Sequence, residues 1–128
     1  MQIKGINHIA IATKDINATI NLYEILFNTN SSKLIEVPDQ GIISAYIPIQ
    51  GAGIEILQPI DPNGAIQKFI EKKGEGFHHV AVNVDSIEKS INELSTDGVR
   101  LILGTANGKT AAFIHPKCTG GVLVELCE

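Results

Sequence analysis

Residues 7–12 read NHIAIA and residues 78–83 read HHVAVN, so one short motif occurs twice in the chain. An offset of 79 − 8 = 71 residues pairs His8 with His79 and aligns the residues that follow each histidine. The aliphatic residues recur with a period of two, which is typical of a β-strand with one apolar face. Each histidine therefore opens a short predicted strand at an equivalent point of a repeated unit.

The repeat extends over most of the chain. Residues 51–57 (GAGIEIL) resemble residues 120–126 (GGVLVEL), and an offset of 125 − 55 = 70 pairs Glu55 with Glu125. Loops of unequal length in two copies would produce this small drift in offset. We predict a single domain over residues 1–128, made of two modules: about 1–70 and about 74–128.

Each module is predicted to follow the order βαβββ. Asp15 can cap the helix of the first module, and the matching helix begins at Asp85 or Ser86. The apolar stripe of the first helix is expected to be Ile16, Ile20, Tyr23 and Phe27. Residues 65–73 are predicted to form a linking helix that ends at Gly74. The fold class is therefore α+β, with two tandem βαβββ modules forming a curved mixed sheet around a cleft. The other predicted strands span about residues 33–37, 42–49, 53–58, 99–103, 110–115 and 121–127.

Composition narrows the class of protein. The formal net charge is 10 − 14 = −4 without a block of like charges, which argues against a nucleic-acid partner. Hydrophobic residues make up 44% of the chain against 19% charged, as expected of a buried core. No apolar run approaches the ~18 residues of a membrane span, and no signal-peptide pattern opens the sequence. Cys118 and Cys127 are then expected to be reduced thiols of a cytoplasmic protein.

Four residues at repeat-equivalent positions can carry chemistry: His8, Glu55, His79 and Glu125. Each glutamate lies between two aliphatic residues, so alternation directs both carboxylates to the opposite face of the sheet. A carboxylate among apolar residues is costly unless it is paired or bound to a metal, and alternation brings no Lys or Arg within reach. A lone strand histidine is more often structural, but the joint pattern favours a divalent cation in the cleft: Co, Ni, Mn, Fe or Zn.

Neighbouring residues are expected to have supporting roles. Three small residues share the face of the histidines and are expected to leave space for a cavity: Ala10, Ala12 and Ala81. Strict alternation turns His78 to the face opposite His79, so we predict a structural role for His78. His115 is expected to cap the turn formed by residues 115–117.

The duplicated order and the four residues resemble the vicinal oxygen chelate superfamily of glyoxalases, bleomycin resistance proteins and dioxygenases. The resemblance covers almost the whole chain and is strongest to the methylmalonyl-CoA epimerase branch. It implies that His8, Glu55, His79 and Glu125 are metal ligands. It rests on these segments: NHIAIA at 7–12, EILQP at 55–59, GEGFHHVA at 74–81, FIHPK at 113–117 and GGVLVEL at 120–126.

The resemblance also implies a chemistry, the removal of a proton beside a carbonyl while the metal stabilises the resulting enolate. Glu125 is the implied catalytic acid/base. Epimerisation needs a second proton-transfer group or one mobile acid/base. Some epimerases carry a second carboxylate where Ser44 stands here, and the nearby carboxylates are Glu36 and Asp39.

Contacts with the substrate are expected from Ser44, Lys109, His115 and Lys117. A coenzyme A thioester is polyanionic while the chain is net negative, so local cations must attract it. Lys109 and Lys117 are predicted on loops near the strands of the second module. For both lysines, a solvated surface position is the commoner case.

The leading expectation is a metal-dependent isomerase that interconverts (R)- and (S)-methylmalonyl-CoA. One alternative is a lyase of the glyoxalase I type, for which the same ligand set is suitable. Another is a non-catalytic small-molecule-binding protein of the same scaffold, which the presence of all four ligands disfavours. The expected partners are a small-molecule thioester and a second copy of the chain in a homodimer, with neither nucleic acid nor membrane. The resemblance favours a site built within one chain.

Overall fold

The computed structural model describes residues 1–106 and 108–128. Three α-helices and eight strands alternate with two short 3₁₀ turns, η1 and η2. In chain order they are β1 (Ile3–Ala12), α1 (Ile16–Phe27), β2 (Ile35–Val37), η1 (Pro38–Gln40), β3 (Ile42–Ile49), β4 (Ala52–Pro59), α2 (Ala65–Lys73), β5 (Gly76–Val84), α3 (Ile87–Thr96), β6 (Leu101–Ala106), β7 (Lys109–Ile114), η2 (Pro116–Cys118) and β8 (Val124–Cys127).

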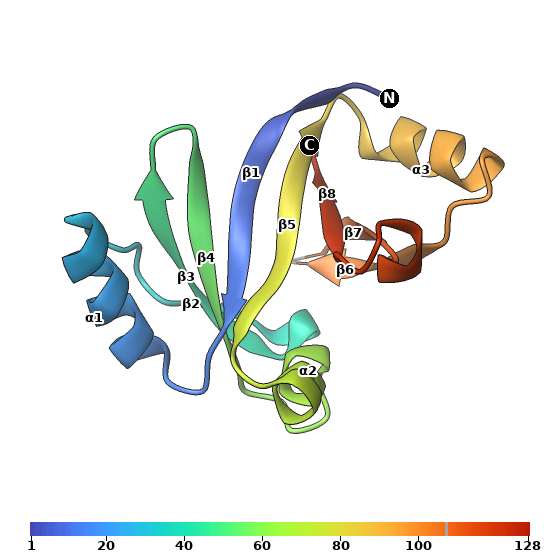
Figure 1. Ribbon diagram of the computed structural model, residues 1–128. Coiled ribbons are helices and arrows are strands. Elements are labelled where there is room, and N and C mark those ends of the chain that lie inside the picture. Colours follow the sequence, from blue (N-terminus) through green and yellow to red (C-terminus); the bar gives the residue numbers. More distant parts are fainter. Residues whose placement is uncertain (107) are drawn as a thin grey trace.

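All eight strands form one mixed sheet in the order β2-β3-β4-β1-β5-β8-β7-β6. β1 and β5 pair antiparallel at its centre, and each has a parallel neighbour, β4 beside β1 and β8 beside β5. The two halves of the sheet therefore repeat one arrangement about the central pair. Figure 1 shows the sheet curled, with α1 and α3 at opposite ends and α2 below the middle. The predicted α+β class and the curved mixed sheet are confirmed.

Local sequence signals explain where the helices begin and end. The Asp15 carboxylate accepts a hydrogen bond from the Ala18 amide at 3.1 Å and caps α1, as predicted. Ser86 rather than Asp85 caps α3, and its hydroxyl accepts from the Lys89 amide at 3.2 Å. The linking helix α2 ends at Gly74, also as predicted, and the φ of +81° there favours glycine.

Apolar side chains fill both faces of the first half of the sheet. On the outer face, Ile16 and Ile20 of α1 pack on Ile54 and Ile56 of β4. On the inner face, Ile66 and Ile70 of α2 pack against a group of buried residues that includes Ala10, Ala12 and Leu57. The alternation of β4 therefore buries its aliphatic residues under α1 and turns Glu55 to the inner face.

Three expectations differ from the structure. Ala10, Ala12 and Ala81 do not line the cavity, because the first two make room for α2 instead. β8 begins at Val124 rather than near residue 121, because Gly120 and Gly121 adopt φ values of +76° and +105° that a regular strand excludes. Phe27, expected on the buried stripe of α1, is the last residue of that helix and is exposed. Within the described ranges, no helix is both long and apolar enough to cross a membrane.

Candidate metal centre and active site

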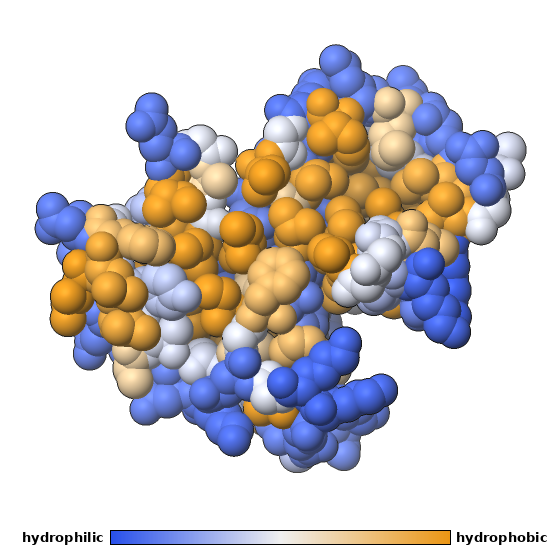
Figure 2. Space-filling model, in the orientation of Figure 1, coloured by the Kyte–Doolittle hydropathy of each residue, from blue (hydrophilic) through white to orange (hydrophobic). Residues whose placement is uncertain are grey.

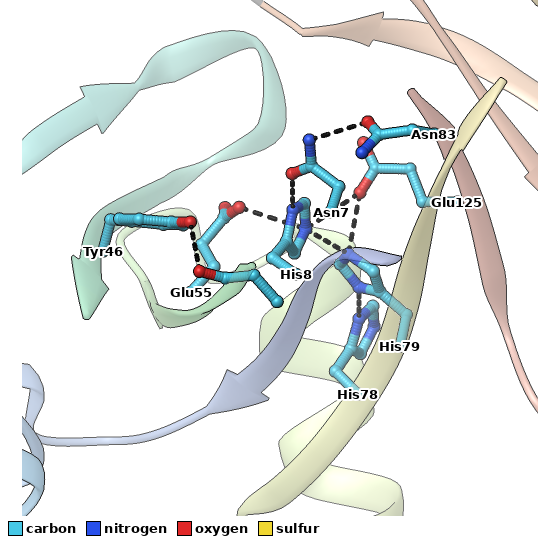
Figure 3. Close-up of polar contacts among 9 residues, drawn as sticks. Asn7, His8, Tyr46, Glu55, His78, His79, Asn83 and Glu125 are labelled. Atoms are coloured by element: carbon cyan, nitrogen blue, oxygen red, sulfur yellow. Dashed lines mark hydrogen bonds and ion pairs between the residues drawn. The ribbon is translucent and has the colours of Figure 1, made fainter. Parts of the chain in front are cut away.

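Four adjacent strands at the centre of the sheet supply the four predicted residues. β4, β1, β5 and β8 carry Glu55, His8, His79 and Glu125 respectively. The two histidines occupy the inner strands and the two glutamates the outer ones. Figure 3 shows Glu55 and Glu125 on opposite sides of the His8 ring. The topology therefore brings together side chains that are up to 117 residues apart (125 − 8 = 117).

His8 lies at the centre of the group. Its Nε2 is 3.2 Å from His79 Nε2, 3.2 Å from Glu55 Oε2 and 3.3 Å from Glu125 Oε2. His79 Nε2 lies 2.8 Å from the same Glu125 oxygen. Both histidines are buried. One imidazole nitrogen therefore has three polar neighbours, although it carries at most one proton.

The donor set fits a divalent cation. His8, His79 and Glu125 each offer a ligand atom, and these three atoms lie within 4.8 Å of one another. No Lys or Arg in the described ranges forms an ion pair with either glutamate. A mixture of imidazole nitrogen and carboxylate oxygen is suitable for first-row transition metals and zinc. Glu55 is not one of these three residues, and within the described ranges its ion pair is with His8. Its place as a fourth ligand remains a prediction.

The surroundings shift the pKa values of Glu125 and Glu55 in opposite directions. Burial alone would raise the pKa of Glu125, but hydrogen bonds from His79 and His8 outweigh it and lower this pKa to about 2. Burial raises the pKa of Glu55, and the charge of His8 offsets this only in part. Burial opposes the charged form of His8, yet its hydrogen bond to Glu125 and the two carboxylate charges raise its pKa. Glu125 is therefore an ionised carboxylate at neutral pH.

The metal-free protein should lose stability in acid because of Glu125. A carboxyl whose pKa falls from an ordinary 4.5 to about 2 stabilises the fold above pH 4.5. This contribution disappears as the pH falls towards 2, a loss of up to about 3 kcal/mol in the free energy of unfolding. Urea titrations with a chelator at several pH values measure it, and Glu125→Gln should lack this part of the pH dependence. Equal pH slopes for the two proteins would contradict the assignment.

A cavity of about 700 Å³ opens over this centre and draws its walls from both halves of the sheet. Its lining includes Ser44, Tyr46, Leu57, Ile66, Phe113 and Leu123, together with Glu55, His79 and Glu125. The Tyr46 ring lies over Gly53, where a Cβ would come within 2.0 Å of it. Its hydroxyl donates to the Ala52 carbonyl at 3.0 Å. A glycine at position 53 therefore allows an aromatic wall beside Glu55.

His78 contradicts its predicted orientation. The register between β1 and β5 passes from Ala10↔His79 to Ile11↔Phe77, so His78 is an extra residue in a β-bulge. It lines the cavity beside His79 instead of facing away from it. Burial, followed by the charge of His79, lowers the pKa of His78 to about 4, so its ring is neutral at pH 7. Strict alternation fails here because the bulge interrupts it.

Asn7 is a residue of the centre that the sequence reasoning missed. Its side-chain oxygen lies 2.7 Å from His8 Nδ1, and its amide nitrogen donates to Asn83 Oδ1 at 2.9 Å. The offset of 78 − 7 = 71 makes it the repeat partner of His78. Two consecutive polar residues between apolar ones, in both copies, are the signal that could have found it.

Comparison with known proteins identifies the family of the chain. The profile of the Glyoxalase/Bleomycin resistance protein/Dioxygenase superfamily matches residues 7–113, which is most of the sequence. The chain belongs to this superfamily. The match spans both copies of the motif and both histidines of the centre, so the resemblance seen in the sequence is confirmed.

Individual members of the superfamily cover nearly the full chain. The mitochondrial methylmalonyl-CoA epimerase of Dictyostelium discoideum is 34% identical over 128 residues, which cover 96% of this chain and 77% of that protein. The crystal structure of methylmalonyl-CoA epimerase from Mycobacterium tuberculosis has 32% identity and a TM-score of 0.87, covering 97% of this chain and 87% of that one. A variant of the Streptomyces coelicolor methylmalonyl-CoA epimerase, in complex with 2-nitronate-propionyl-CoA, has 27% identity and a TM-score of 0.90 over 98% of this chain and 94% of that one.

Of the four residues predicted to contact the substrate, one lines the cavity and three do not. Ser44 is buried in the cavity wall. Lys109, His115 and Lys117 do not line the cavity, so a role for them requires a substrate that extends past its walls. His115 does cap its turn, since its Nδ1 accepts from the Lys117 amide at 3.1 Å.

The two other carboxylates considered from the sequence also differ in position. Asp39 lines the cavity, whereas Glu36 lies on β2, is exposed and does not line it.

Proposed function

We propose that the protein is a divalent-metal-dependent epimerase that interconverts (R)- and (S)-methylmalonyl-CoA. The observation that carries the proposal is the convergence of two buried imidazoles and an ionised carboxylate under a cavity of about 700 Å³. The identity of 32–34% to methylmalonyl-CoA epimerases across nearly the whole chain supports this substrate over other superfamily substrates. An acyl-CoA analogue in the S. coelicolor structure supports a thioester ligand.

His8, Glu55, His79 and Glu125 would hold the cation, with Co, Ni, Mn or Zn as the candidates. When bound, the ion would supply positive charge that stabilises an enolate of the thioester substrate. The buried imidazoles of His8 and His79 keep water from one side of the site. The apolar part of the lining, including Leu57, encloses the substituted carbon.

Glu125 is proposed to move the proton at C2. Its low pKa keeps it ionised at neutral pH, so it can accept a proton without first losing one. The second face of C2 needs another group, and Ser44 cannot serve as a base at neutral pH. Glu55 flanks the histidines on the side opposite Glu125, lines the cavity and forms its ion pair with His8. We therefore assign the return of the proton to Glu55.

Exchange of the C2 proton with solvent tests the proposed function. Methylmalonyl-CoA is incubated in D₂O with the metal-loaded protein, and deuterium at C2 is followed by NMR. Incorporation that depends on the protein is the expected result. Absence of exchange would refute this substrate, and conversion of the methylglyoxal–glutathione hemithioacetal instead would assign a glyoxalase I activity.

The proposal extends to assembly and compartment. Ile6, Ile9 and Phe77 on the central strands are exposed, and Figure 2 shows apolar side chains gathered over the middle of the molecule between α1 and α3. We propose that a second copy covers this face in a homodimer, which light scattering tests as a mass twice the 13.7 kDa of one chain. Two free cysteines fit a cytoplasmic protein, and cell fractionation tests the compartment.

A further inference from the structure

Two β-bulges occur at equivalent points of the two halves, each one residue before a histidine of the centre. In β1 the register passes from Ile6↔Val82 to His8↔Ala81, so Asn7 is the extra residue. In β5 the extra residue is His78, as described above. A bulge re-aims a side chain that regular alternation would turn away. Both bulges therefore bring a second polar side chain to the face of the sheet that carries the histidines.

Each bulge residue contacts the same atom of the histidine that follows it. Asn7 Oδ1 lies 2.7 Å from His8 Nδ1, and His78 Nδ1 lies 2.7 Å from His79 Nδ1. The opposite ring nitrogens, the two Nε2 atoms, face each other and the carboxylates. Figure 3 shows this arrangement, with Asn7 above the His8 ring and His78 below the His79 ring.

Different neighbours hold the two bulge residues in place. The Asn7 amide donates to Asn83 Oδ1 at 2.9 Å, which directs the amide oxygen towards His8. The His78 ring packs edge-to-face on Phe69 of α2, with ring centroids 4.7 Å apart. Asn Oδ1 and His Nδ1 are the same number of bonds from the backbone. An asparagine and a histidine can therefore place an acceptor at the same point.

We propose that Asn7 and His78 are matched positioning residues that accept the Nδ1–H of His8 and His79 and so present both Nε2 atoms to the cation. A ring that donates from Nδ1 has its lone pair on Nε2, so these acceptors select the tautomer that can bind metal. The inference rests on the metal centre of the proposed function. It does not depend on which substrate the centre acts on.

The inference is tested by titrating the purified protein with Co²⁺. Isothermal calorimetry and visible absorption measure the binding. His78→Leu removes the acceptor and should weaken Co²⁺ binding by about 10–100-fold. His78→Asn copies the first half of the chain and should bind within about threefold of wild type. Asn7→Leu should show a loss similar to that of His78→Leu. Circular dichroism of each variant reports whether it is folded.

The outcomes separate this inference from the proposed substrate. Wild-type affinity in folded His78→Leu would overturn it, as would His78→Asn binding as weakly as His78→Leu. A wild-type protein that binds no Co²⁺ would overturn it together with the metal centre. Tight Co²⁺ binding with the expected order of variants, but without exchange of methylmalonyl-CoA, would support the positioning role and refute the substrate.

Discussion

Glu125→Gln is expected to slow exchange of the C2 proton of methylmalonyl-CoA by about 10²–10⁴-fold, the range for loss of a positioned acid/base. The amide keeps the size of the side chain but cannot accept the proton. His8, His79 and Glu55 remain to hold the metal, so the loss of rate should exceed the loss of metal affinity. Exchange rates measured in D₂O at saturating metal separate the two effects.

Glu36→Gln is the matched control for this prediction. Glu36 is an exposed carboxylate on β2 that does not line the cavity. Its neutralisation changes the net charge by the same amount and should leave exchange unchanged. Full exchange in the Glu125→Gln protein would remove Glu125 from its proposed role.

Removal of the metal is expected to abolish exchange, and His8→Ala should prevent its recovery. His8 Nε2 is the atom on which the other three side chains converge. Without the His8 ring, one imidazole and two carboxylates remain to bind the metal. We expect a chelated wild-type protein to regain exchange on addition of Co²⁺, and His8→Ala to bind Co²⁺ at least about 100-fold more weakly.

Chelated wild type and His8→Ala are compared at equal Co²⁺ concentrations, with His115→Ala as a histidine control outside the cavity lining. His115→Ala should bind Co²⁺ as tightly as wild type does. Undiminished exchange in the presence of a chelator that has removed all metal would show that the reaction does not need the cation.

The duplication made the centre predictable from the sequence. His8 pairs with His79 and Glu55 with Glu125 at nearly one offset, and a repeated fold places such pairs at equivalent points. Alternation around each glutamate then predicted the face, because the flanking aliphatic residues need a core. Neither step requires knowledge of loops, which is where the two copies differ most.

The two bulges were beyond this reasoning, because a period of two assumes that no residue is inserted. One extra residue reverses the face of its neighbour, which is why His78 joins the cavity against the prediction. The polar pair of His78 and His79 between Phe77 and Val80 is the sign of the insertion in the sequence, but strict alternation does not make use of it. The sequence also did not predict that α2 packs on the alanines of β1. Alanines on a strand are compatible with an open cavity or with a closely packed helix.

The most direct test of the central claim is a crystal structure of the protein soaked with Co²⁺, with anomalous data collected at the cobalt edge. The account predicts one strong peak within coordination distance of Nε2 of both His8 and His79 and of a carboxylate oxygen of Glu125, with Glu55 completing the set. A peak elsewhere, or an ordered centre whose imidazoles and carboxylates bind one another without cobalt, would contradict it.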